Sequence, residues 1–242
     1  MLAQLCLTLK PESGDITYRK SSRLQGVLME QISEKYAEKL HEQSVHPYSQ
    51  YVTAESDGTI SWYVSTLNEE AYHQIIEPLQ SPLFSSFQFS NGLRITIQRK
   101  RLIKRFEEEL LEASQEGSNA IRLSFRTPTA FRQKGAYTLF PEPILLYQSL
   151  LIRMNTVSDL PIAGGEEAIS YLAEKSLVSQ YSLKTMLFPE ERVNIPGFMG
   201  GLAIHFTGNK EERAMASYLF RFGTFSGIGV KTGMGMGALR ME

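Results

Sequence analysis

The predicted order of elements in this 242-residue chain is strand, helix, strand, strand, helix, strand, and the order occurs twice. Period-two alternation marks the strands, apolar stripes mark the helices, and an acidic, then Ser/Gly-rich segment at 107–119 separates the halves. This order is typical of an α+β protein with two tandem ferredoxin-like (RRM-like) βαββαβ domains. We expect the first domain at 1–112 and the second at 118–242.

Apolar spacing, cap residues and turn residues define the elements of the first half. They are a strand at 2–9, a helix at 21–42, strands at 48–54 and 59–67, a helix at 68–79 and a strand at 92–100. Leu5, Leu7 and Leu9 share one face, as in a half-buried strand. The turn signal ESDG predicts a hairpin, and Asn68 is a suitable helix cap.

The second half repeats the order of elements without a residue-level repeat. Its elements are a strand at 119–128, a helix at 144–154, strands at 176–188 and 193–206, a helix at 209–225 and a short strand at 236–241. In the first of these strands, Ile121, Leu123 and Phe125 face inward. Arg122 and Arg126 then lie on the opposite face.

Composition limits the class of protein. The net charge of −1 is lower than that of a general nucleic-acid coat protein, although basic residues gather at 94–105 and 122–134. The apolar runs fall short of a membrane span, and the N-terminus lacks the basic start of a signal peptide. One cysteine, Cys6, excludes an internal disulfide framework and a multi-cysteine zinc site. We therefore expect a cytoplasmic protein without a membrane partner, cofactor or metal, and EEE at 107–109 is expected to be a solvated helix face.

The C-terminal sequence GIGVKTGMGMGALRME is rich in glycine around one lysine. Its glycines and their polar neighbours are Gly227, Gly229, Lys231, Thr232, Gly233, Gly235 and Gly237. A P-loop is excluded because Val230 replaces its second glycine, and a dinucleotide fingerprint is excluded because too little chain remains for its helix. Packing against a sheet accounts for two or three of the glycines. We therefore expect a loop whose backbone N–H groups approach the phosphates of a polyanion.

The glycine spacing and four other segments together resemble the CRISPR repeat-cleaving endoribonucleases, a family within the superfamily of repeat-associated RNA-binding proteins. The other segments are LQG (24–26), LHEQSVHPYSQY (40–51), RTPTAFR (126–132) and IPGFMGGLAIHF (195–206). The resemblance extends over nearly the whole chain. It implies metal-independent cleavage of precursor CRISPR RNA within repeats, by attack of a 2′-hydroxyl on the adjacent phosphate. The implied products carry a 2′,3′-cyclic phosphate and a 5′-hydroxyl.

The same resemblance assigns His41 of the LHE segment as a general base or acid. In isolation, His41 would be a cation that favours a helix C-terminus. His46 matches the place of a phosphate-supporting lysine in some relatives, and it is either a second proton-transfer group, a charge donor or a solvated loop residue. Of the other histidines, His73 is expected at the surface and His205 on a sheet face.

A helix tyrosine found in some relatives is replaced here by Met29, which cannot transfer a proton. Tyr36 is expected in the core, and Tyr48 is a weaker substitute. For this reason a second hypothesis stays open, a non-catalytic subunit that binds repeat RNA within a CRISPR interference complex. A nucleotide-binding regulator is a third and weaker hypothesis.

RNA binding is expected at the glycine-rich tail and at Arg122, Arg126 and Arg132, each of which could also be a solvated surface charge. The partners implied by the resemblance are repeat RNA, as precursor and as mature guide RNA, and other subunits of an interference complex. A homodimer is a further candidate assembly.

Overall fold

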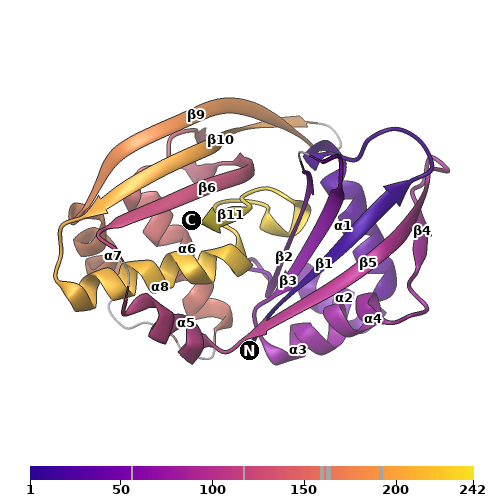
Figure 1. Ribbon diagram of the computed structural model, residues 1–242, viewed down its shortest axis with the longest axis horizontal. Coiled ribbons are helices and arrows are strands. Elements are labelled where there is room, and N and C mark those ends of the chain that lie inside the picture. The colour runs from indigo at the N-terminus through magenta and orange to yellow at the C-terminus, as the bar shows by residue number, and fades with distance from the viewer. Residues whose placement is uncertain (56, 117, 159–160, 162–164, 191–192) are drawn as a thin grey trace.

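Two antiparallel sheets lie side by side in the computed structural model, each with helices packed on it (Figure 1). The structure describes residues 1–55, 57–116, 118–158, 161, 165–190 and 193–242. Gly117, in the predicted boundary segment, and Ser56, in the predicted hairpin turn, lie outside these residues.

The first unit contains all the elements predicted for the first half. Its elements are β1 (Leu2–Pro11), a 3-10 turn (Tyr18–Lys20), α1 (Ser21–Gln31), α2 (Glu34–Glu42), β2 (Tyr48–Ala54), β3 (Ile60–Thr66), α3 (Glu69–Ala71), a π turn (Tyr72–Ile76), α4 (Glu77–Gln80), β4 (Ser86–Gln88) and β5 (Arg94–Arg105). The strand order β2-β3-β1-β5-β4 is antiparallel at every pairing. Without the edge strand β4, this is the order of a ferredoxin-like sheet.

The second unit has the same topology. Its elements are α5 (Glu107–Ser114), β6 (Ala120–Thr129), β7 (Phe131–Gln133), β8 (Ala136–Thr138), α6 (Pro143–Val157), α7 (Gly165–Glu174), β9 (Ser176–Glu190), β10 (Val193–Phe206), α8 (Lys210–Ser226), a 3-10 turn (Thr232–Met234) and β11 (Leu239–Met241). Its sheet order is β11-β6-β10-β9, and β7 and β8 form a separate hairpin. The predicted fold class of two tandem ferredoxin-like units is confirmed.

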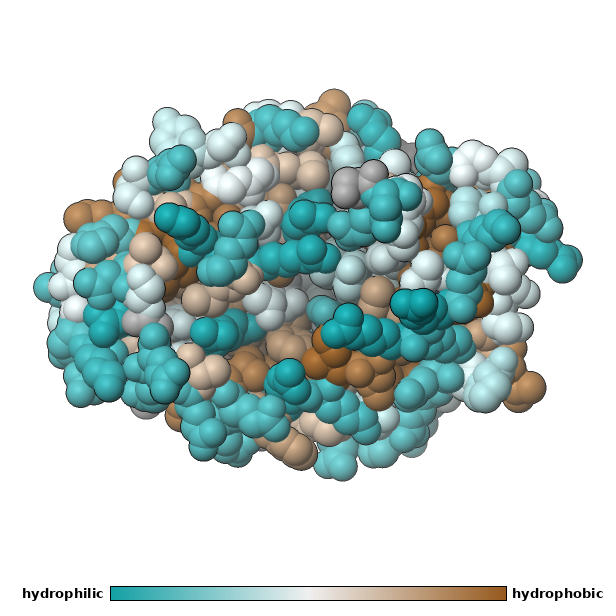
Figure 2. Space-filling view, in the orientation of Figure 1, coloured by the Kyte–Doolittle hydropathy of each residue, from teal (hydrophilic) through white to brown (hydrophobic). Residues whose placement is uncertain are grey.

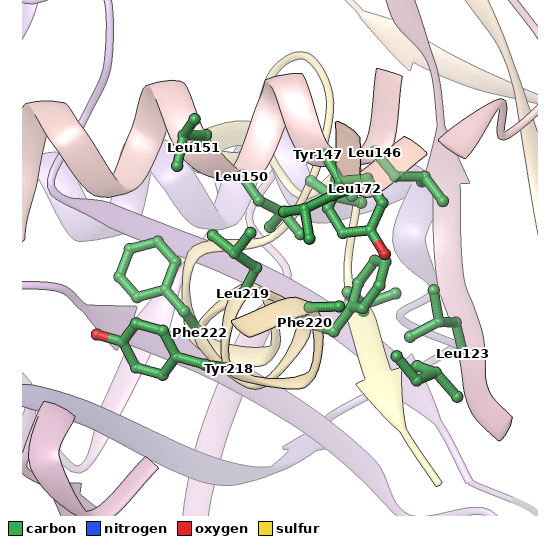
Figure 3. Close-up of a cluster of buried hydrophobic side chains, with 14 of the residues drawn as sticks. Leu123, Leu146, Tyr147, Leu150, Leu151, Leu172, Tyr218, Leu219, Phe220 and Phe222 are labelled. Atoms are coloured by element: carbon green, nitrogen blue, oxygen red, sulfur yellow. The ribbon is translucent and has the colours of Figure 1, made fainter. Parts of the chain in front are cut away.

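Each unit buries an apolar core between its sheet and its helices. In the first unit, Leu5, Leu7 and Trp62 are fully buried under the helices. In the second, leucines and aromatic rings of α6 and α8 pack against Leu123 of β6 (Figure 3). Burial of apolar surface of this kind is the main force that holds the helices on the sheets.

Several local features differ from the sequence predictions. The helix expected at 21–42 is two helices, because Ser33 is extended and its hydroxyl accepts a hydrogen bond from the Tyr36 N–H as the cap of α2. The boundary segment contains α5, and Glu107 is buried rather than solvated: it accepts hydrogen bonds from Tyr218 and Ser158. The β7–β8 hairpin and α7 were not expected.

The two units meet along one face of the first sheet. Glu55 after β2 pairs with Arg126 of β6 at 3.3 Å and with Arg240 of β11 at 3.7 Å. Arg240 also donates to the Tyr63 hydroxyl at 3.1 Å.

On the face of the molecule in Figure 2, hydrophilic residues predominate and apolar residues form small patches between them. Among the described helices, none has the length and apolar character required to cross a bilayer.

Candidate functional site

The two histidines singled out from the sequence lie at the end of α2 and in the loop after it. His41 is exposed in the last turn of α2, where a positive ring interacts favourably with the helix dipole. His46 is partly buried, and its ring stacks on Tyr48 with centroids 5.5 Å apart and planes 2° apart. Its ring nitrogens face the backbone carbonyls of Leu40 and Gln43. His46 is therefore held by the fold and is not a solvated loop residue.

The surroundings of His46 favour its neutral form. Burial is the largest effect that lowers the pKa of His46, followed by the positive charge of Arg153 and, more weakly, that of His41. Hydrogen bonds to the carbonyls oppose the shift without cancelling it. At neutral pH the ring is therefore uncharged, and Arg153 of the second unit acts on a histidine of the first.

Contacts within the protein require glycine at four of the five tail positions, more than the two or three that packing was expected to explain. Four of them have positive φ angles: Gly227 (+65°), Gly229 (+79°), Gly235 (+110°) and Gly237 (+70°). A Cβ on Gly237 would lie 1.9 Å from the Ile228 carbonyl oxygen, and one on Gly229 would lie 2.3 Å from that of Ala130. These close approaches and positive φ angles are by themselves sufficient to require glycine at these positions. Contact of these glycines with RNA stays a prediction.

The glycine-rich tail of the second unit contacts the loop at residues 43–47 of the first unit, which carries His46 and is called the histidine loop below. A Cβ on Gly233 would lie 3.1 Å from His46 Nδ1 and 3.1 Å from the Tyr48 hydroxyl oxygen. Gly235 lies against Ser21, at the start of α1, where a Cβ would meet the Ser21 Cβ at 2.2 Å. The turn at Thr232–Met234 therefore packs on α1 and β2 beside His46.

Most backbone N–H groups of the tail are already used within the protein. The amide of Gly229 donates to the Ser149 hydroxyl, and that of Gly237 to the Pro128 carbonyl. Among the hydrogen bonds of the described residues, none engages the amides of Lys231, Thr232 and Gly233. Consecutive amides of this kind, with Lys231 left-handed at φ +55°, resemble an anion-binding nest. This turn, and not the whole glycine run, is the part of the tail whose amides have no partner among the described residues, although Thr232 and Gly233 are themselves buried.

Lys231 forms an ion pair within the protein. Its ammonium contacts the Glu190 carboxylate at the end of β9 and lies 3.8 Å from the Met234 sulfur. Glu190 itself lines an open hollow of about 580 Å³ between α1 and the β9–β10 hairpin, together with Arg19 and Arg23. These two arginines were not singled out from the sequence, since nothing in their spacing separates them from other surface charges.

The three arginines predicted to bind RNA do not form one cluster. Arg122 is exposed on β6 and lines a hollow with Ser182 and Glu242. Arg126 is paired with Glu55 and so connects the two units. Arg132, on β7, lines a cavity beside Gly229 and Arg153.

Arg153 is a further residue that the sequence did not indicate. Its guanidinium donates to the Gly229 carbonyl at 2.8 Å, and burial lowers its pKa to about 10, so it stays charged at neutral pH.

Tyr36 and Tyr48 are both buried, which was expected for Tyr36, and a catalytic role for Tyr48 stays a prediction. Met29 packs against the first core and Tyr36 is buried there. Tyr48 is buried beside Gly233, accepts a hydrogen bond from Gln25 at 3.3 Å, and burial raises its pKa to about 12.

The remaining histidines also lie as expected. His73 is on the surface between Glu69 and Glu77, and His205 is exposed on β10. Within the described ranges, no three His, Cys, Asp or Glu side chains gather as metal ligands would.

Sequence comparison relates the chain to known endoribonucleases. The family described as CRISPR-associated endoribonuclease Cas6 matches residues 123–239. The CRISPR-associated endoribonuclease Cas6 of Mycobacterium tuberculosis is 32% identical over 251 residues, which cover 100% of this chain and 78% of the relative. A Cas6 of Streptococcus thermophilus is 29% identical over 222 residues, 91% of this chain and 90% of the relative.

Solved structures give the same relationship. A Cas6 product complex superposes with a TM-score of 0.80 and 25% identity, over 100% of this chain and 99% of that chain. A protein described as an RAMP protein that binds different RNA substrates shares the fold at a TM-score of 0.62 and 15% identity, covering 99% of each chain. The resemblance noted in the sequence is therefore confirmed, and the chain belongs to the Cas6 family of CRISPR-associated endoribonucleases.

Proposed function

We propose that this chain cleaves precursor CRISPR RNA within its repeats without a metal ion. In this reaction the 2′-hydroxyl 5′ to the cut loses its proton and attacks the adjacent phosphate. The leaving 5′ oxygen gains a proton, and the products are a 2′,3′-cyclic phosphate and a 5′-hydroxyl. Such a reaction requires a base, an acid and donors for the charge on the phosphorane.

One observation carries the proposal: the tail turn of the second unit packs on the histidine loop of the first. Gly233 lies against His46 and Tyr48, and the amides of Lys231, Thr232 and Gly233 are unused by the described residues. This contact supports a site in which His46, together with His41 at the end of α2, acts on a phosphate held by the C-terminal tail. Cas6 relatives solved as a product complex and as a substrate-mimic complex support a repeat-RNA substrate.

The roles follow from exposure and charge. His41 is exposed at the end of α2, where its imidazole is open to a bound RNA, so we assign it proton transfer. His46, kept neutral and held by backbone carbonyls, accepts a proton or positions the end of α2, which carries His41. The Tyr48 phenol stays protonated at neutral pH, and its buried ring stacks on His46 and so helps to fix the orientation of the imidazole.

Synthetic repeat RNA from a neighbouring CRISPR array tests the proposal. In EDTA the protein should cut it once per repeat and leave a cyclic phosphate, which acid hydrolysis opens. An RNA with a single 2′-deoxy nucleotide 5′ to the cut should bind equally well and stay intact. Cleavage that requires Mg²⁺, or that proceeds on the deoxy RNA, contradicts the mechanism.

Met29 favours one second candidate, a subunit that binds repeat RNA without cutting it. Tight binding of the all-ribose repeat with no cleavage between pH 5 and 9 would select this candidate. Further subunits of an interference complex, mature guide RNA and a second copy of the chain stay predicted partners.

A further inference from the structure

A cavity of about 260 Å³ lies beside the candidate site, between α6, β7 and the tail. It is at the small end of ligand pockets, so it fits one planar ring system rather than a longer ligand. Val45, the neighbour of His46, lines one side of it, and Gly229 and Val230, directly before Lys231, line another. The cavity is therefore next to the histidine loop and to the phosphate-binding turn at once.

The lining of the cavity combines apolar surface with hydrogen-bonding groups. Phe131, Val45 and Ile152 supply the apolar surface, and Ile152 is 50% exposed although its side chain is wholly apolar. Arg132 and Gln148 are exposed, and neither has a hydrogen bond or ion pair to another described residue. Arg153 adds a guanidinium fixed by its bond to the Gly229 carbonyl.

These features match the way in which proteins hold a base that has left its stack. An unstacked base packs its faces on aromatic, apolar or guanidinium groups, and its edge exchanges hydrogen bonds with side chains. The Gln148 amide offers both donors and an acceptor to such an edge. A lipid or peptide ligand would not require this unpaired amide beside two arginines.

We propose that this cavity binds one unstacked nucleobase of the repeat RNA, from a nucleotide adjacent to the cleaved phosphate. The base anchors its ribose, and the backbone then passes over the amides of Lys231–Gly233 toward His41 and His46. This inference rests on the proposed function, since it names a binding site for the same RNA.

The test uses non-cleavable repeat RNA in which one base at a time is removed, with dissociation constants from fluorescence anisotropy. Wild-type protein should lose roughly tenfold in affinity at one position near the cut, as expected for one stacked base. Ile152→Asp should show the same loss with intact RNA, and no further loss when that base is absent. Ile144→Asp is the matched control, because Ile144 is exposed on α6, two turns away, and does not line the cavity.

Gln148→Ala provides a second test, and it does not endanger folding because Gln148 is exposed. Thermal melts verify that each variant is folded. The same coupling to one base position should appear, with a smaller loss. The wild-type protein could cut the repeat while the losses of RNA affinity from base removal and from Ile152→Asp add at every base position. That result overturns the cavity proposal and leaves the proposed function intact. If wild-type protein neither binds nor cuts the repeat, both are overturned.

Discussion

Replacement of Gly233 by alanine tests the packing of the tail on the histidine loop. Gly233 is the one of the five tail glycines without a positive φ angle, so alanine brings no backbone strain there. The new methyl group would lie 3.1 Å from His46 Nδ1 and 3.1 Å from the Tyr48 hydroxyl oxygen. Such contacts are shorter than ordinary van der Waals separation, so the ring pair or the turn must move by a few tenths of an ångström.

The size of the effect follows from that displacement. Overpacking of this kind costs about 1–3 kcal/mol of stability, and the lower end applies because one methyl group is added beside a partly buried ring. Misplacement of reacting groups by about 1 Å can cost roughly 100-fold in rate, so a few tenths of an ångström should cost roughly tenfold. RNA affinity should change little, since the amide donors remain.

Single-turnover cleavage measures the rate, and urea unfolding of the same preparation measures the stability. Gly237→Ala is the comparison, because its Cβ would lie 1.9 Å from a backbone oxygen at φ +70° and should destabilise the fold without a selective effect on rate. A Gly233→Ala protein with wild-type rate and stability would refute the contact between the tail and His46.

Three further changes have defined outcomes. The pKa of His46 is lowered in the folded state, so the free energy of unfolding should fall as the pH drops below about 6.5. Between pH 7.5 and 5.0 the urea midpoint of His46→Asn should therefore fall less than that of the wild type. Equal falls in the two proteins would contradict the lowered pKa. Lys231→Met should reduce the slope of log affinity for RNA against log salt concentration by about 0.7. Glu190→Gln removes the ion-pair partner of Lys231 and should tighten RNA binding by up to about fivefold at low salt. Unchanged slopes would show that Lys231 does not contact the RNA. Glu107→Leu should lower the free energy of unfolding in urea by about 1–3 kcal/mol, because the Tyr218 hydroxyl loses its buried acceptor. Glu108 is exposed, so Glu108→Gln should leave the stability unchanged. Equal stability of the two variants would contradict the role of Glu107.

Elements with strong local signals could be predicted from the sequence. The strands at 48–54 and 193–206 have the predicted bounds, and Asn68 and Asn209 cap helices through hydrogen bonds to backbone N–H groups. Alternation on β6 correctly placed Leu123 inside and Arg122 outside. These features depend on neighbours within a few residues, and the sequence shows such neighbours directly.

Contacts between distant segments could not be predicted in this way. Gly233 and His46 are far apart in the chain, and neither residue carries a local mark of the other. Arg153 looks like an ordinary residue of an apolar helix until the tail folds onto it and supplies the Gly229 carbonyl. The turn after β7, where Lys134 and Gly135 both have positive φ angles, was missed because a short hairpin with one glycine has a weak signal.

Single-turnover cleavage of the repeat RNA in EDTA by wild-type and His41→Ala proteins tests the central claim most directly. The account predicts cleavage by the wild type at one phosphate, and a rate lower by about 100-fold or more in His41→Ala, with the dissociation constant for RNA nearly unchanged. Cleavage by His41→Ala at the wild-type rate, or a wild-type protein that is inactive until Mg²⁺ is added, would contradict it.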